Sequence, residues 1–422
     1  MKRTTGLVVL LLSVLFLPAQ QKVTLEQCYA KALENYPLTR QAELLVSSHD
    51  LTLNNLNKNY LPSMAINGQV HYQSDVTKVP VQEVPVFGVE PLEKDWYKVM
   101  LDVNQVIYDG SQTSRKKDLE MVNLEIEQQN LEIELYNLKA RINQVFFNIV
   151  LLDKNAIILN LHKSTLEERQ KTLESGVRNG TILASNLDIL KAEILQVEQS
   201  LIELVISKEA AMAILREYTA IDLDEGTSFI LPEVYVNTGL YENNRPEYAL
   251  FSIQQRKIET SKKLIGSRNL PKLSAFGQAG YGRPGFDMLK NQFDDFYMVG
   301  ARLSWNFWDW NHARKEREIL DLRYDILSTQ KETFDKHVRI DLENKLAGIR
   351  KAERLIEKDE AIIALREKIT ASSSSQLENG TINSTEYVAE LNAESKARLD
   401  LEVHNIELVK AKLEYQTTLG NL

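Results

Sequence analysis

The fold of this chain is decided by residues 111–173, which read SQTSRKKDLEMVNLEIEQQNLEIELYNLKARINQVFFNIVLLDKNAIILNLHKSTLEERQKTL. The stretch contains no glycine or proline and is rich in leucine, glutamate, lysine and glutamine. It therefore predicts one continuous helix. Roughly 63 residues would make a rod about 95 Å long, at a rise of about 1.5 Å per residue.

Apolar residues recur along this rod in alternating steps of four and three residues. The series is Leu131, Leu135, Leu138, Ile142, Val145, Ile149, Leu152, Ala156 and Leu159. Such spacing predicts a coiled-coil seam against neighbouring helices. An ordinary core helix is the alternative, and it would have a broader apolar face and a shorter run.

The residues that follow the rod occur twice in the chain. Asn179, Gly180, Thr181 and Ile182 recur 200 positions later as Asn379, Gly380, Thr381 and Ile382. We therefore predict an internally duplicated unit, with one copy at 21–243 and the other at 244–422. Each copy should contain a helix, two strands, a long helix and a short helix. Strands are expected near 62–74, 96–108, 271–282 and 296–308, and helices near 24–59, 111–174, 184–219, 245–268, 311–374 and 384–418.

The amino terminus predicts export from the cytoplasm. Lys2 and Arg3 precede an apolar stretch at 7–17, and small and polar residues follow it. This pattern is typical of a signal peptide, here 1–20, that is removed after export. A membrane anchor is the alternative, but it would need about 20 apolar residues.

Several classes of function are excluded by composition. The formal charge is −9, and lysine and arginine alternate with glutamate along the predicted helices, which argues against nucleic acid as a partner. The six histidines are isolated from one another and from the single cysteine, so we expect no metal site. No phosphate loop, nucleophile elbow or nucleotide fingerprint occurs, and we expect no cofactor and no enzymatic activity.

The predicted strands have the length and alternation of membrane-spanning strands. In the first, Met64, Ile66 and Val70 alternate with polar residues, and the other strands follow the same pattern. A soluble antiparallel sheet with one face on a core is the alternative. Aromatic residues gather near the strand ends, where girdles meet lipid head groups. They are Tyr72, Trp96, Tyr97, Tyr108, Tyr281, Phe296, Tyr297, Trp305, Trp308 and Trp310.

Four strands are too few to close a barrel, since about eight are needed to surround packed side chains. Open strand edges are also not tolerated in lipid. We therefore expect several copies of the chain to share one barrel, with the rods continuing it as a helical tube. The predicted fold class is mainly α with β: long coiled-coil helices forming an α-helical barrel, and four transmembrane strands per chain in a shared oligomeric β-barrel.

Short motifs in this order resemble the TolC-like outer-membrane efflux factors. They are the Leu25, Glu26, Ala30, Leu33, Asn35 and Pro37 pattern, Leu61-Pro62, Tyr108-Asp109-Gly110, and the hairpins at 180–193 and 380–393. The resemblance implies a homotrimer with a twelve-stranded barrel in the outer membrane of a Gram-negative bacterium and a helical tunnel in the periplasm. It also implies a periplasmic adaptor and an inner-membrane pump as partners, in tripartite efflux or type I secretion.

The resemblance implies two kinds of site at the ends of the hairpins. Adaptor docking would fall on Asn179, Gly180, Thr181, Ile182, Asn379, Gly380, Thr381 and Ile382. An exposed isoleucine would offer a partner something to bury, although Asn-Gly can also be a simple turn with isoleucine as a local staple. The candidates for a periplasmic gate are Asn186, Asp188 and Glu386.

A non-channel envelope protein, such as a periplasmic coiled-coil adaptor, is the alternative to an exit duct. Adaptors also have long hairpins, but they place soluble β domains around one hairpin, whereas here a pair of strands precedes each of two rods. The sequence does not distinguish drugs, metal ions and proteins as the exported substrate.

Overall fold

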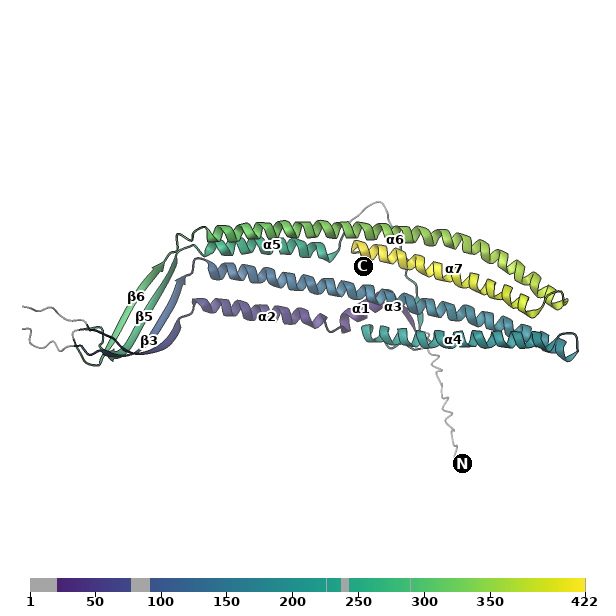
Figure 1. Cartoon of the computed structure of the whole chain (residues 1–422), viewed down its shortest axis with the longest axis horizontal. Coiled ribbons are helices and arrows are strands. Elements are labelled where there is room, and N and C mark those ends of the chain that lie inside the picture. The colour runs from purple at the N-terminus through teal and green to yellow at the C-terminus, as the bar shows by residue number, and fades with distance from the viewer. Residues whose placement is uncertain (1–20, 77–91, 225, 237–242, 289, 422) are drawn as a thin grey trace, which may run out of the picture. The chain divides into compact units, whose positions relative to one another are not determined.

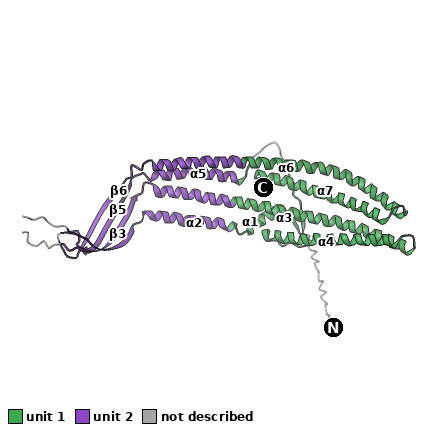
Figure 2. Ribbon diagram, in the orientation of Figure 1, with its two compact units in different colours: residues 1–39, 132–246, 335–422 green, residues 40–131, 247–334 purple. Residues whose placement is uncertain are grey.

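The computed structural model describes residues 21–76, 92–224, 226–236, 243–288 and 290–421. The predicted signal peptide, 1–20, lies outside the described residues. The described chain forms two compact units. Unit 1 comprises residues 1–39, 132–246 and 335–422, and unit 2 comprises 40–131 and 247–334 (Figure 2). Each unit therefore contains segments from both predicted copies.

Most of the described chain is helical, and the helices alternate with short groups of strands (Figure 1). The helices are α1 (Leu25–Asn35), α2 (Thr39–Asn57), the short 3-10 helix η1 (Lys58–Tyr60), α3 (Gln112–Arg178), α4 (Ala184–Thr219), α5 (Pro246–Ser267), α6 (His312–Glu378) and α7 (Ser384–Leu419). The strands are β1 (Lys22–Thr24), β2 (Ser63–Tyr72), β3 (Asp95–Tyr108), β4 (Ser228–Ile230), β5 (Lys272–Arg283) and β6 (Asp294–Ser304).

The long helices have matching lengths. Helices α3 and α6 each contain 67 residues, and α4 and α7 each contain 36. Helix α6 continues through Gly348 without a break, since a single glycine weakens a helix but leaves its hydrogen bonds possible. The helix expected over 24–59 is divided into α1 and α2, because Pro37 holds the preceding Tyr36 in an extended conformation.

The start of α1 is fixed by the side chain of Thr24. Thr24 accepts a hydrogen bond from the Gln27 amide, and the Gln27 side chain accepts one from the Thr24 amide. This reciprocal pair is a capping box, and it satisfies two helix-end donors. Strand β1, just before it, pairs in parallel with β4, which follows α4 in the chain. The sequence analysis did not predict this pairing.

The core of unit 1 forms where α1, α4, α7 and the β4 segment cover the middle of α3. Ile142, Phe146 and Ile149 are fully buried there, and Phe147 and Val150 are nearly so. The buried face is thus broader than the predicted coiled-coil seam, because several segments cover α3 at this level. Helix α3 includes an 18-residue window apolar enough to cross a membrane by composition, but 33% of that window is buried inside the structure.

A second core of unit 1 joins the ends of the two hairpins. Leu166 and Leu173 of α3 are buried with Leu190 of α4, and Tyr387 and Leu391 of α7 belong to the same cluster. Leu166 and Leu173 are seven residues apart, which is the spacing of a coiled-coil position. At the hairpin ends, the buried face of α3 is as narrow as a coiled-coil seam, because few helices surround it there.

Unit 2 contains one four-stranded antiparallel sheet with the order β2-β3-β5-β6. Strands β2 and β6 are its edges. Strand β6 ends at Ser304, so Trp305 and Phe307 lie beyond the sheet, although the sequence analysis placed both on the strand. A bulge between Val106 and Tyr108 leaves Ile107 without a partner in β5 and sets Tyr108 opposite Leu273.

Candidate functional site

The sheet of unit 2 has one face made almost entirely of apolar residues. The cross-strand register aligns Ile66 with Leu101, Leu101 with Ala279, and Ala279 with Tyr297. Because side chains alternate along each strand, every second residue lies on this face. The apolar face consists of Met64, Ile66, Gly68, Val70, Tyr72, Tyr97, Val99, Leu101, Val103, Leu273, Ala275, Gly277, Ala279, Tyr281, Tyr297, Val299, Ala301 and Leu303.

This apolar face has no core packed on it among the described residues. Ile66 is 76% exposed and Val299 is 77% exposed, and Val70, Tyr72 and Leu303 are similarly open to solvent. A soluble antiparallel sheet would cover such a face with helices or a second sheet. The predicted alternative of a sheet resting on a core is therefore wrong for the described residues.

The opposite face of the sheet is polar. Asp102 accepts hydrogen bonds from the side-chain amides of Asn67 in β2 and Gln278 in β5. Arg302 lies on the same face, and its guanidinium covers the ring of Phe276. The sheet thus has one face suited to lipid and one suited to water, as each wall of a membrane barrel requires.

Two aromatic residues proposed for the lipid interface lie on the polar face. Trp96 directly precedes Tyr97, and Phe296 directly precedes Tyr297. Adjacent residues of a strand lie on opposite faces, and both tyrosines lie on the apolar face. Trp96 and Phe296 therefore lie on the polar face. Trp96 contacts His71, and Phe296 is only 8% exposed. The structure thus places both side chains on the face opposite the apolar one. Tyr72, Tyr97, Tyr281 and Tyr297 lie on the apolar face as expected.

The remaining predicted interface aromatics gather after β6 and at the end of β3. Trp305 donates a hydrogen bond from Nε1 to the carbonyl of Asn269 at 3.1 Å. Trp308 and Trp310 contact each other edge to face and are both exposed, and Tyr108 is also exposed. Exposed tryptophan next to a bare apolar face is the arrangement found in aromatic girdles.

Aspartates form the turns that lead from the strands into the long helices. Asp109 accepts hydrogen bonds from the Thr113 amide at 2.7 Å and from the Tyr60 hydroxyl at 3.0 Å. Asp309 accepts them from the Ala313 amide at 3.0 Å and from the Asn269 side chain at 2.7 Å. Each carboxylate thus satisfies a free amide at the positive end of a 67-residue helix.

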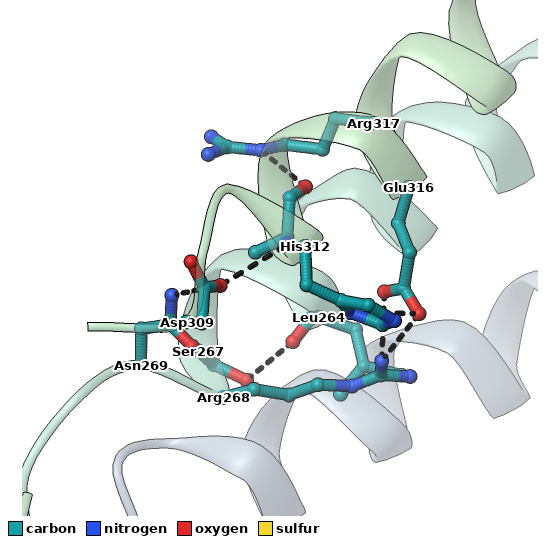
Figure 3. Close-up of polar contacts among 9 residues, drawn as sticks. Leu264, Ser267, Arg268, Asn269, Asp309, His312, Glu316 and Arg317 are labelled. Atoms are coloured by element: carbon teal, nitrogen blue, oxygen red, sulfur yellow. Dashed lines mark hydrogen bonds and ion pairs between the residues drawn. The ribbon is translucent and has the colours of Figure 1, made fainter. Parts of the chain in front are cut away.

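The protonation of these two aspartates follows from their partners. Burial of Asp109 opposes its ionisation, but the hydrogen bonds from Thr113 and Tyr60 outweigh burial and keep its pKa below the usual value. The hydrogen bond from Asn269, and then that from Ala313, lowers the pKa of Asp309. Figure 3 shows the second turn, where Arg268 and His312 both approach the carboxylate of Glu316.

The predicted docking tips form tight turns at the ends of the hairpins in unit 1. Gly180 and Gly380 have φ values of 72° and 70°, a conformation that favours glycine. Thr181 donates both its amide and its hydroxyl to the carbonyl of Gly176, and Thr381 does the same to Gln376. Asn379 donates its side-chain amide to Ser375, and Asn179 is exposed.

The isoleucines of the two tips are half-buried rather than exposed. Ile182 and Ile382 both pack against the hairpin-end core, and a Cβ at Gly176 would lie 2.4 Å from the Ile182 side chain. They are local staples, which was the alternative that the sequence left open. The exposed apolar residue is instead the neighbouring Leu183, which is 72% exposed. The sequence analysis did not identify it, because adjacent apolar residues in a turn give no signal of which one is buried.

The gate candidates lie on the first turns of α4 and α7. Glu386 completes a capping box with Asn383, accepting its amide at 3.1 Å, so part of its role is to fix the start of α7. Asn186 accepts a long hydrogen bond of 3.5 Å from the Ser384 amide, which links the two hairpins. Asp188 is exposed.

A stronger link between the hairpins involves Arg169, which the sequence analysis did not identify. Arg169 of α3 forms a 2.8 Å ion pair with Glu378 of α6 and a hydrogen bond with Ser374, and it covers the ring of Tyr387 in α7. Burial opposes its charge, but Glu378 and Tyr387 outweigh that effect and raise its pKa. No spacing pattern reveals this residue, because its partners are about 200 positions away.

Comparison with known proteins identifies the fold at the level of structure. No family model matches the chain, and no curated protein matches it in sequence. Solved structures match over 94% of the chain. The outer membrane protein VceC of Vibrio cholerae is 12% identical with a TM-score of 0.68, over 96% of its own length.

Two further structures show the same likeness. The CmeC outer membrane channel of Campylobacter jejuni is 14% identical with a TM-score of 0.67, over 85% of its length. The MtrE outer membrane channel of Neisseria gonorrhoeae, solved in its open state, is 13% identical with a TM-score of 0.66, over 88% of its length. The chain has the mainly helical fold of these outer-membrane channels. The mainly helical fold class is thereby confirmed, whereas the internal duplication and the shared barrel remain predictions.

Proposed function

We propose that this chain is an exit duct in the outer membrane of a Gram-negative bacterium, serving a tripartite efflux or type I secretion system. The observation that carries the proposal is the sheet of unit 2, with a bare apolar face, a polar face and two unpaired edges. Lipid would cover the apolar face, and a water-filled pore would hydrate the polar one. Small molecules or other substrates would pass from the periplasm to the exterior, without cofactor or enzymatic step.

The two unpaired edges support an oligomer. Strands β2 and β6 each have one side without a partner strand in the described chain, and a bilayer offers no water to hydrate such an edge. Pairing β6 of one copy with β2 of the next satisfies both edges. The number of copies rests on the resemblance to the TolC-like efflux factors, which implies a homotrimer with a twelve-stranded barrel, built here from an internally duplicated chain.

The helices offer surfaces for the same assembly. Leu195, Ile202 and Ile206 are exposed along α4, and Ile362, Leu365 and Ile369 are exposed along α6. Residues of each set recur at spacings of three, four or seven, which places them on one side of their helix. Burying them against neighbouring copies would make the helical barrel that lies in the periplasm.

A periplasmic adaptor is less well supported. An adaptor in water would have to cover the apolar face of the sheet, which is bare among the described residues. The two functions separate experimentally, because osmotic shock releases an adaptor without a lipid anchor and leaves a barrel in the membrane.

A direct test of the proposed function combines extraction and conductance. The full-length protein should require detergent for extraction, migrate as an oligomer, and conduct ions after reconstitution into a planar bilayer. A monomer that dissolves without detergent, or an oligomer that never conducts, would contradict the proposal.

The hairpin tips are proposed to dock a periplasmic adaptor, which would connect the duct to an inner-membrane pump. Leu183→Asp is expected to abolish cross-linking to that adaptor, because it removes the exposed apolar side chain at the first tip. Leu183 is also the N-cap of α4 and makes no side-chain cap, so aspartate should support the helix. Loss of docking would then not reflect loss of fold.

The matched control for this experiment is Asn383→Asp at the N-cap of α7, which keeps a capping side chain and adds the same charge without removing an apolar group. Its cross-linking should stay near the wild-type level. Unchanged cross-linking of Leu183→Asp would remove the docking assignment. Asn186, Asp188 and Glu386 remain our proposed gate, and Arg169 is proposed to hold the hairpins together next to it.

A further inference from the structure

The loop between β5 and β6 contacts both faces of the sheet. Its described residues, 284–288 and 290–293, carry two phenylalanines with different partners. The ring of Phe293 stacks on Tyr281 of the apolar face, with 5.6 Å between ring centroids. The ring of Phe286 contacts Phe296 of the polar face at 4.5 Å. One loop therefore places an aromatic ring on each side of the sheet end.

The loop is attached to the end of the sheet by polar contacts. Asn291 accepts a hydrogen bond from the amide of Glu93, and Arg283 pairs with Glu93 at 3.1 Å and with Asp95 at 2.6 Å. These contacts connect the β5–β6 loop to the segment that leads into β3. The position of Phe286 over the polar face is given by its ring contact with Phe296.

On the polar face, Phe286 belongs to a group of aromatic rings, two of which contact the ammonium of Lys98. We define the polar-face cluster as His71, Trp96, Lys98, Phe286 and Phe296. The ammonium of Lys98 lies 5.3 Å from the Trp96 ring and 5.9 Å from the Phe296 ring. The His71 ring lies 5.2 Å from that of Trp96.

Two glycines of β5 make room for this cluster. Gly280 is directly opposite Phe296, and a Cβ at Gly280 would lie 2.6 Å from Phe296 Cζ and 2.7 Å from the carbonyl oxygen of Val99. Gly282 is directly opposite Lys98, and a Cβ there would lie 2.9 Å from Lys98 Cγ. The absence of side chains at these two positions lets the Phe296 ring and the Lys98 stem approach the backbone of β5 closely.

The charge of Lys98 is not neutralised within the described residues. No ion pair with a carboxylate is found for it there, and its ammonium contacts aromatic rings instead. Asp102, on the same face of β3, accepts hydrogen bonds from the amides of Asn67 and Gln278 instead. A cation held by ring contacts keeps its field available to whatever passes along this face.

We propose that the polar-face cluster forms a selective constriction inside the barrel, narrowed by Phe286 and favouring anions through Lys98. The proposal rests on the proposed function, because the polar face becomes the pore wall only if the sheet closes into a barrel with other copies. A constriction lined by aromatic rings and one cation would favour organic anions that carry an aromatic group. Such an anion could stack its ring on the aromatic side chains and pair its negative charge with the ammonium of Lys98.

Single-channel recording of the full-length protein in planar bilayers tests this proposal. Phe286→Ala should raise the conductance by roughly 1.3-fold or more, because pore radius at a constriction controls current. Phe293→Ala is the matched control, since it removes the same ring from the same loop on the apolar face. Its conductance should equal that of the wild type.

The charge is tested in a potassium chloride gradient. Lys98→Gln should shift the reversal potential toward cation selectivity. Lys290→Gln, which removes a lysine already paired with Asp287, should leave it unchanged. Equal effects of Phe286→Ala and Phe293→Ala, or no shift with Lys98→Gln, would overturn the inference while the channel function stands. A wild-type protein without conductance would overturn the proposed function and this inference together.

Discussion

Ile66→Arg is expected to prevent the chain from inserting into the outer membrane, while Ala65→Arg leaves insertion intact. The two residues are neighbours in β2 and lie on opposite faces of the sheet. Ile66 is opposite Leu101 on the bare apolar face. An arginine there must enter lipid, at a cost of about 2–4 kcal/mol near the bilayer midplane. The cost applies to every copy in the oligomer.

Ala65 provides a control with the same substitution. It lies opposite Asp102 on the polar face, where an arginine finds water and a carboxylate. Membrane fractionation and an unheated gel measure the outcome as the amount of detergent-extracted oligomer. Equal yields from the two variants would contradict the assignment of the apolar face to lipid.

Phe146→Ala is expected to destabilise unit 1 by about 3–5 kcal/mol, the range for removing a fully buried phenylalanine from a core. Phe146 has no exposed surface. Its ring contacts Phe147 and Phe229 edge to face, with centroid distances of 6.0 Å and 5.6 Å. The substitution leaves a cavity under the β4 segment, and the rigid helices around it limit its collapse.

The measurement is the loss of helical circular dichroism in urea, on the full-length protein in detergent. Ile157→Ala on the same helix is the control, because Ile157 is 58% exposed and its loss creates no cavity. The free energy of unfolding of the Ile157→Ala variant should stay within about 0.5 kcal/mol of the wild-type value. A Phe146→Ala protein as stable as the control would show that this core contributes little to stability.

Some features of the site follow from periodicity, and others depend on contacts between distant residues. The two faces of the sheet could be predicted because alternation along β2 and β5 is local information. The same alternation places Trp96 and Phe296 on the polar face, so their face could have been predicted from the sequence. Their position near the strand ends, on which the prediction relied, does not determine the face. Arg169 and Leu183 could not be found in this way, since their roles depend on which neighbours cover them.

The sequence by itself determined the long helices and the two-faced strands. Long stretches without helix breakers allow backbone hydrogen bonds to continue, and hydrophobic periods of 3.5 and 2 residues distinguish helix from strand. Only the tertiary structure decided that Ile182 is buried against Gly176 while Leu183 is exposed, and that Phe286 reaches the polar face. Burial is a property of all the segments that meet at a point, and residues far apart in the chain supply them.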